Sequence, residues 1–242
     1  MRNRKWRVLS LLLVAVMTLG ILFGCSKDGG EKGSGGKGGK KDTIIIATMA
    51  EPPTLSPTEQ NAIASSYMNA LTFSQLTRMN EDMEMEGALA ESFENTSETE
   101  WVFHLRKGVK FHNGEEMTAD DVVTSITYAK TCPEINLYNA SVEKIEKVDD
   151  YTIKITTPGP SAILLSDLAH HGNAIMPKKL LDEGHNFSTD PIGTGPYKHV
   201  EWKRGDSLEF EMFEDYWDEE HMPSIKHMIW KIIPEGSSRT IA

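Results

Sequence analysis

A run of seventeen residues without a single apolar side chain, Ser26–Asp42, divides the chain into two unequal parts. Seven of these residues are glycine, so the run has no apolar surface with which to form a core. We therefore expect residues 25–42 to be a flexible tether rich in glycine and lysine. Any hydrophobic core must come from residues 43–242, a length that suits one large domain or two small ones.

The residues before the tether have the layout of an export signal. Basic residues are concentrated in Arg2–Arg7, and a mostly apolar run follows from Val8 to Phe23. As a helix this run would reach about 24 Å, which is short of the roughly 30 Å hydrocarbon core of a bilayer. We expect residues 1–24 to be a signal peptide; the alternative is a permanent single-span anchor.

The export signal ends in Leu22-Phe23-Gly24-Cys25, which resembles the lipobox of bacterial lipoproteins. In that motif an aliphatic residue at −3 and a small residue at −1 precede a cysteine, which is acylated and becomes the new N-terminus. The resemblance implies that Cys25 carries lipid. The folded part would then be anchored at the extracytoplasmic face of the cell membrane without entering the bilayer.

Charge is distributed unevenly along the chain. Residues 1–41 hold nine of the 25 Lys and Arg but only two of the 36 Asp and Glu, so the remainder is strongly acidic. Nucleic-acid binding needs a basic face that displaces counterions, and we therefore expect no nucleic-acid partner. The acidity opposes self-association, which favours a monomer and leaves neutral or cationic ligands open.

Hydrophobic patterning after the tether predicts a mixed α/β fold. The β-branched run Thr43–Met49 lacks alternation, which predicts a central strand covered on both faces. The spacing of Ile63, Tyr67 and Leu71 predicts a helix with these side chains on its apolar face. Thr118 and Asp121 have the form of a capping box and predict the start of another helix. Alternation and turn residues predict further strands at 101–105, 151–155, 198–202, 207–213 and 226–233.

The histidine, cysteine and glycine-rich motifs that usually indicate catalysis or metal binding do not have the spacing that either function needs. His170 and His171 form the densest histidine cluster, but adjacent residues on a helix point about 100° apart and do not naturally chelate one ion. Gly193-Thr194-Gly195-Pro196 superficially resembles a phosphate loop, yet its proline lacks an N–H, and a tight turn that needs the φ freedom of glycine is the favoured interpretation. We expect no catalytic residues, no metal and no cofactor. Cys132 is expected to be an inert, half-buried residue.

Two positions stand out as candidate ligand contacts. Glu51 lies where the first predicted strand ends and the chain turns away, the usual ligand position on open α/β sheets. Tyr138 lies in the irregular stretch Pro133–Ala140 and is the aromatic residue best suited to a cleft. For aromatic residues in general, a place in the core is the more frequent role.

Seven motifs occur in a fixed order along the chain. They are Glu51–Pro57, Leu89–Phe93, Trp101–Glu115, Thr118–Val122, Val148–Thr152, Gly193–Tyr197 and Asp215–Trp217. Together they resemble the solute-binding proteins of peptide and nickel ABC transporters, the extracytoplasmic family 5 lipoproteins. The resemblance runs from about Thr43 to Arg239.

The resemblance implies an α/β clamshell of the periplasmic-binding-protein type II, which captures a solute between two lobes and delivers it to a membrane permease. Residues 43–61 and 174–242 would form the core of the first lobe, and residues 62–173 a subdomain inserted into it. Glu51, Pro52, Pro53, Thr54 and Leu55 would line the cleft, and Tyr138 would face it.

The resemblance also implies that the second lobe is missing, because the sequence ends at Ala242 in a segment that leads to this lobe in the family. We expect the protein to be the solute-binding component of an ABC importer, with peptides as solutes and the permease subunits as partners. The alternative is a truncated, non-transporting lipoprotein that acts as an interaction or receptor module.

Replacement of Cys25 by alanine should release the protein from membranes, because the acylated side chain is then absent. Fractionation of cells that express the variant checks this. If Cys25→Ala stays in the membrane fraction through a retained Val8–Phe23 segment, the lipoprotein interpretation is wrong.

Overall fold

The computed structural model describes residues 42–236, which belong to one compact unit. The predicted signal peptide, the lipidation site Cys25 and nearly all of the tether lie outside the described residues. Within residues 42–236, no helix is both long and apolar enough to cross a bilayer.

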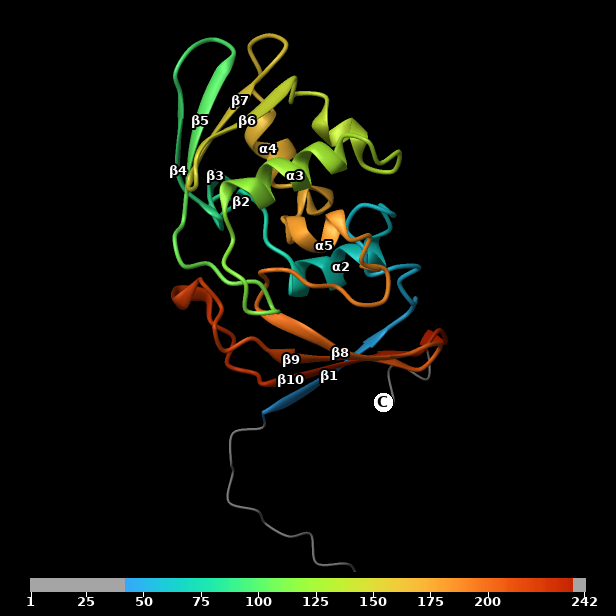
Figure 1. The fold of residues 1–242 in the computed structure, drawn as a ribbon. Coiled ribbons are helices and arrows are strands. Elements are labelled where there is room, and N and C mark those ends of the chain that lie inside the picture. Colours follow the sequence, from blue (N-terminus) through green and yellow to red (C-terminus); the bar gives the residue numbers. More distant parts are fainter. Residues whose placement is uncertain (1–41, 237–242) are drawn as a thin grey trace, which may run out of the picture. The chain divides into compact units, whose positions relative to one another are not determined.

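Strands from the two ends of the described chain form one four-stranded sheet, seen in blue, orange and red in Figure 1. β1 (Thr43–Thr48) pairs in parallel with β10 (His227–Ile232), and β10 pairs antiparallel with β9 (Ser207–Met212). β9 then pairs antiparallel with β8 (Tyr197–Lys203), which completes the order β1-β10-β9-β8. Buried side chains of β8 and β9 pack with Leu55 and with Met68 of α2 (Ile63–Thr72) to form the core on this sheet.

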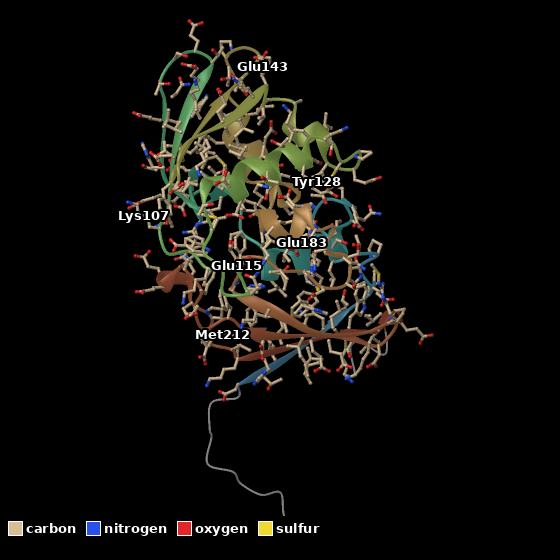
Figure 2. All side chains as sticks on the ribbon, in the orientation of Figure 1. Lys107, Glu115, Tyr128, Glu143, Glu183 and Met212 are labelled. Carbon is tan, nitrogen blue, oxygen red and sulfur yellow. The ribbon has the colours of Figure 1, made fainter. Side chains whose placement is uncertain are left out.

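The middle of the chain forms a second four-stranded sheet with a larger core. Its order is β4-β5-β7-β6, and all its neighbours are antiparallel: β4 (Ala90–Asn95), β5 (Glu100–Leu105), β7 (Thr152–Thr156) and β6 (Lys144–Asp149). α3 (Ala119–Ala129) contributes Val122 and Ile126 to the same core as Phe103, Ile153 and Ile155. Figure 2 draws the side chains on the ribbon, with Tyr128 on α3 and Met212 on β9 labelled.

Shorter elements lie between the strands of the two sheets in sequence. They are the hairpin of β2 (Thr77–Met79) and β3 (Met85–Gly87), the helices α4 (Leu164–Leu168) and α5 (Lys178–Asp182), and the 3-10 turns η1 (Asn136–Asn139), η2 (His171–Asn173) and η3 (Glu219–His221). The first sheet is built from residues within 43–61 and 174–242, and the second from residues within 62–173. The proposed subdomain boundary itself stays a prediction.

The predicted start of the second helix is confirmed in detail. The Asp121 carboxylate accepts the Thr118 N–H at 2.8 Å and the Thr118 hydroxyl at 3.0 Å. Its other oxygen accepts the N–H of Lys178, at the start of α5, at 2.8 Å. One carboxylate therefore begins α3 and also ties it to α5, as expected for an acidic side chain at the positive end of a helix.

The prediction that the first strand is central and covered on both faces is wrong. In the described sheet β1 is an edge strand, and Ile45 is 62% exposed. A run of β-branched residues reports a preference for extended backbone and says nothing about how many neighbours the strand has.

The helix over 63–72 is confirmed, but the apolar face that the spacing indicated is not the most buried one: of its three residues only Leu71 packs against the core. Ile63 is 72% exposed and Tyr67 is 53% exposed, whereas Asn69 and Thr72 are fully buried. The buried side chains of the helix are Ser65, Met68, Asn69 and Thr72, and the backbone of the Gly193–Pro196 loop lies against the end of the helix at Leu71 and Thr72. Tyr67 instead stacks on Trp230 of β10, with ring centroids 6.0 Å apart.

The Gly193–Pro196 loop needs its glycines for close approach and not for φ freedom, which corrects the sequence interpretation. Neither glycine has a positive φ. A Cβ on Gly193 would lie 2.1 Å from the Thr72 carbonyl oxygen, and one on Gly195 would lie 2.5 Å from that of Leu71. The Gly195 N–H donates to the Thr72 carbonyl oxygen at 3.0 Å, so backbone meets backbone at the end of α2.

His112 holds the same loop from the other side. Its Nδ1 accepts the Gly193 N–H at 3.4 Å, and its Nε2 lies 2.9 Å from the Gly195 carbonyl oxygen, to which it donates. Burial lowers the pKa of His112 to about 4. The imidazole is therefore neutral at physiological pH, with one nitrogen free to accept and the other to donate.

Gly195→Ala should lower the free energy of unfolding by at least about 2 kcal/mol, because the added methyl group must displace backbone atoms of Leu71 and Thr72. Urea denaturation of the full chain measures this. Gly159→Ala is the matched control: no atom lies within 4 Å of its added Cβ and its φ is not positive, so the change should stay within about 0.5 kcal/mol. Equal effects at the two glycines would contradict the close-approach explanation.

Candidate functional site

The carboxylate of Glu51 is bound by the turn between β8 and β9. It accepts the indole N–H of Trp202 at 2.7 Å and the backbone N–H of Gly205 at 3.0 Å. The glutamate therefore joins the end of β1 to that turn in the described structure. Its predicted contact with a ligand stays a prediction.

The next four predicted ligand residues differ in exposure. Pro53 is exposed, whereas Pro52, Thr54 and Leu55 are buried. Leu55 belongs to the core on the first sheet, and its N–H donates to the Ser188 carbonyl oxygen at 3.0 Å. The hydrogen bonds of these residues anchor the segment that leads from β1 to α2, and none of them reaches Tyr138.

Tyr138 lies in η1 and is half-buried. Its hydroxyl oxygen accepts a hydrogen bond from the Asn61 side-chain amide at 3.0 Å. Its ring stacks on the imidazole of His170, with centroids 3.5 Å apart and planes 9° apart. Tyr138 therefore joins the end of the segment after β1 to the residues that follow α4.

His170 and His171 extend this stack and are both uncharged at neutral pH. Their ring centroids are 4.1 Å apart. The Nδ1 of His170 accepts the Gly172 N–H at 3.1 Å, which places the ring proton on Nε2. Burial, and then the neighbouring His171, lower the pKa of His170 to about 4. Burial also lowers the pKa of His171, and a hydrogen bond to the Gln60 backbone offsets part of this effect.

We call these residues the ring cluster: Asn61, Ser66, Tyr138, His170 and His171. They come from the start of α2, from η1 and from the turn after α4. The cluster offers flat ring faces and neutral hydrogen-bonding groups, a combination suited to recognising the uncharged or aromatic parts of a small molecule. Within residues 42–236, no group of three or more His, Cys, Asp or Glu side chains is placed to hold a metal ion.

Tyr138 stands out in the sequence as a candidate ligand contact, but its partners in the ring cluster do not. The adjacent histidines His170 and His171 are visible in the sequence, but they suggest a possible metal site and do not indicate ring stacking with Tyr138. Asn61 and Ser66 gave no signal, because polar residues are common near the start of a helix.

Cys132 is buried rather than half-buried and has no disulfide.

A hollow of about 460 Å³ lies elsewhere, at the end of β9, and is lined by charged residues such as Lys198 and Glu211. None of the predicted ligand residues lines it.

Comparisons with known proteins agree on one family. The family model for bacterial extracellular solute-binding proteins, family 5 Middle, matches residues 84–242. The glutathione-binding protein GsiB of Pectobacterium atrosepticum is 30% identical over 81% of this chain and 39% of its own length. The oligopeptide-binding protein AppA of Bacillus subtilis is 29% identical over 98% of this chain and 46% of its own length.

A solved structure agrees with these relatives. NikZ from Campylobacter jejuni, crystallised in complex with Ni(L-His), superposes with a TM-score of 0.72 at 31% identity, over 83% of this chain and 41% of NikZ. The predicted α/β fold of the type II periplasmic binding proteins is thereby confirmed. The chain spans less than half the length of the relatives that it matches.

Acid should destabilise the fold partly through His170. Because its pKa is lower in the folded chain than the usual value of 6.5, the folded state binds fewer protons than the unfolded state. The free energy of unfolding should therefore fall as the pH is lowered from about 6.5 towards about 4. His170→Phe, which keeps a flat ring without the proton site, should reduce this dependence in urea denaturation. His112, His171 and His199, whose pKa values burial also lowers, contribute to the dependence that remains. An unchanged pH dependence in this variant would show that His170 is not held neutral by its surroundings.

Proposed function

The chain belongs to the bacterial extracellular solute-binding proteins of family 5, and we propose on that basis that it is the solute-binding component of an ABC importer, with peptides as its solutes. Members of this family bind solutes and are not enzymes. The ring cluster is the single observation that carries the proposal for this chain, because it gathers recognition groups from separate segments at one place.

The chemistry of the ring cluster supports peptides as the solute class. A peptide backbone presents amide N–H and carbonyl groups without net charge. The Tyr138 hydroxyl accepts from Asn61 and keeps its own hydrogen for donation, and the Nε2–H of His170 is a second neutral donor. Both donors suit carbonyl oxygens of a bound peptide, and the ring faces suit its side chains.

Two features support a place at the membrane. The lipobox around Cys25 supports a lipid anchor at the extracytoplasmic face of the cell membrane, and the tether supports a folded part that reaches the permease subunits from there. The acidity of residues 42–242 supports a monomer.

Titration of the full chain with the tripeptide Ala-Phe-Ala, followed by NMR, tests the proposal. We expect saturable shifts of the Tyr138 ring and His170 imidazole signals, because these rings contact the solute. Tyr138→Ala should abolish the saturable shifts at His170. Tyr151→Ala is the control, since Tyr151 bonds Glu116 beside the start of α3 whereas Tyr138 follows the end of that helix, and it should leave these shifts intact.

Thermal midpoints of both variants must show that they remain folded. Saturable binding that survives Tyr138→Ala would contradict the ring cluster as the site. Absence of any saturable shift in the unaltered chain would contradict solute binding by this chain.

A further inference from the structure

A cavity of about 370 Å³ adjoins the ring cluster on the side of the β2–β3 hairpin. We call it the methionine cavity. Its lining includes Arg78, Met79, Met85, Tyr138, Asp167 and His170. Its volume lies in the range of small-molecule sites. Two of its residues, Tyr138 and His170, are also the stacked pair of the ring cluster, so the cavity continues that surface.

One wall of the methionine cavity is built from thioethers. Met79 and Met85 lie directly opposite each other across the β2–β3 ribbon, and both line the cavity. Methionine side chains are flexible and polarisable, and their sulfur atoms make favourable contacts with aromatic rings. Met79 is half exposed, so other described residues do not fully cover its side chain, which remains accessible to a guest.

The other wall is a flat stack of rings. Tyr138 and His170 are almost parallel, at 9° between planes, with one face of each ring against the other, and both residues line the cavity. Because the imidazole is neutral, the stack carries no charge that would repel or attract an ion. Uncharged rings of this kind favour an aromatic guest, which can meet them edge to face or stacked.

The charged groups of the cavity already have partners. The Arg78 guanidinium is paired with Glu86 at 2.6 Å and with Asp218. The Asp167 carboxylate accepts the Ser141 hydroxyl at 2.5 Å. A charged guest would therefore have to compete with existing ion pairs and hydrogen bonds, whereas an apolar guest needs only the thioethers and the rings.

We propose that the methionine cavity is a subsite for an aromatic side chain of the solute, held between Met79 and Met85 on one wall and the Tyr138–His170 stack on the other. The inference rests on the proposed function for its peptide context. It goes further by naming the side-chain class that this chain prefers and the hairpin residues that set the preference.

The direct test uses the full chain labelled with [¹³C-methyl]methionine and titrated with N-acetyltryptophanamide. The ring current of a bound indole should shift the Met79 and Met85 methyl signals. Met83 is the internal control, because it lies on the same hairpin, is exposed and does not line the cavity. Its signal should stay in place. Shifts that are absent at Met79 and Met85, or equal at all three methionines, overturn the proposal.

A second measurement gives the preference in binding. The unaltered chain should bind Ala-Phe-Ala about fivefold more tightly than Ala-Ala-Ala. Met79→Gln and Met85→Gln, which keep side-chain length but add a polar amide, should each bring this ratio towards one. Met83→Gln should leave the ratio unchanged. A ratio that is insensitive to Met79→Gln and Met85→Gln overturns the proposal.

The two measurements separate this inference from the proposed function. Tripeptide binding without an aromatic preference and without methyl shifts contradicts the methionine cavity and leaves solute binding intact. Methyl shifts with N-acetyltryptophanamide in a chain that binds neither tripeptide support the cavity and contradict peptide binding.

Discussion

The close approach of the Gly193–Pro196 loop to the end of α2 is the constraint on which the remaining arrangement depends. Backbone atoms meet there without any side chain between them, and the hydrogen bond from Gly195 to Thr72 fixes their distance. His112 bonds both glycines from the opposite side, and the Phe213 N–H donates to the Pro196 carbonyl oxygen at 2.8 Å. Three segments that are distant in sequence from one another are thereby held by one short loop.

This constraint explains where the ring cluster lies. The loop contacts the end of α2 at Leu71 and Thr72, and the start of the same helix lies near η1 and the turn after α4. Asn61 then reaches the Tyr138 hydroxyl, and Ser66 lies 3.4 Å from the ring nitrogens of His171. The site is thus a consequence of how α2 is seated, and its residues need not be close in sequence.

Local structure was largely predictable from the sequence, and long-range arrangement was not. Alternation around Phe103 and Ile153 indicated strands whose inward residues are indeed buried, because a strand with one covered face carries that pattern in its own residues. The capping residues Thr118 and Asp121 likewise act within one turn of helix. The edge position of β1 and the packed face of α2 depend on partners more than a hundred residues away, for which no local pattern exists. For the same reason Tyr138 could be proposed as a ligand contact, but its stack with His170 could not.

Hydrogen–deuterium exchange of the full chain, with and without a saturating tripeptide, tests most directly whether the ring cluster is where this chain contacts its solute. The account predicts slower exchange in the segments around Asn61–Ser66, η1 and His170–Gly172, with little change in β4–β7. Protection confined to the turn of β8 and β9 that holds Glu51, or to the hollow at the end of β9, would contradict it.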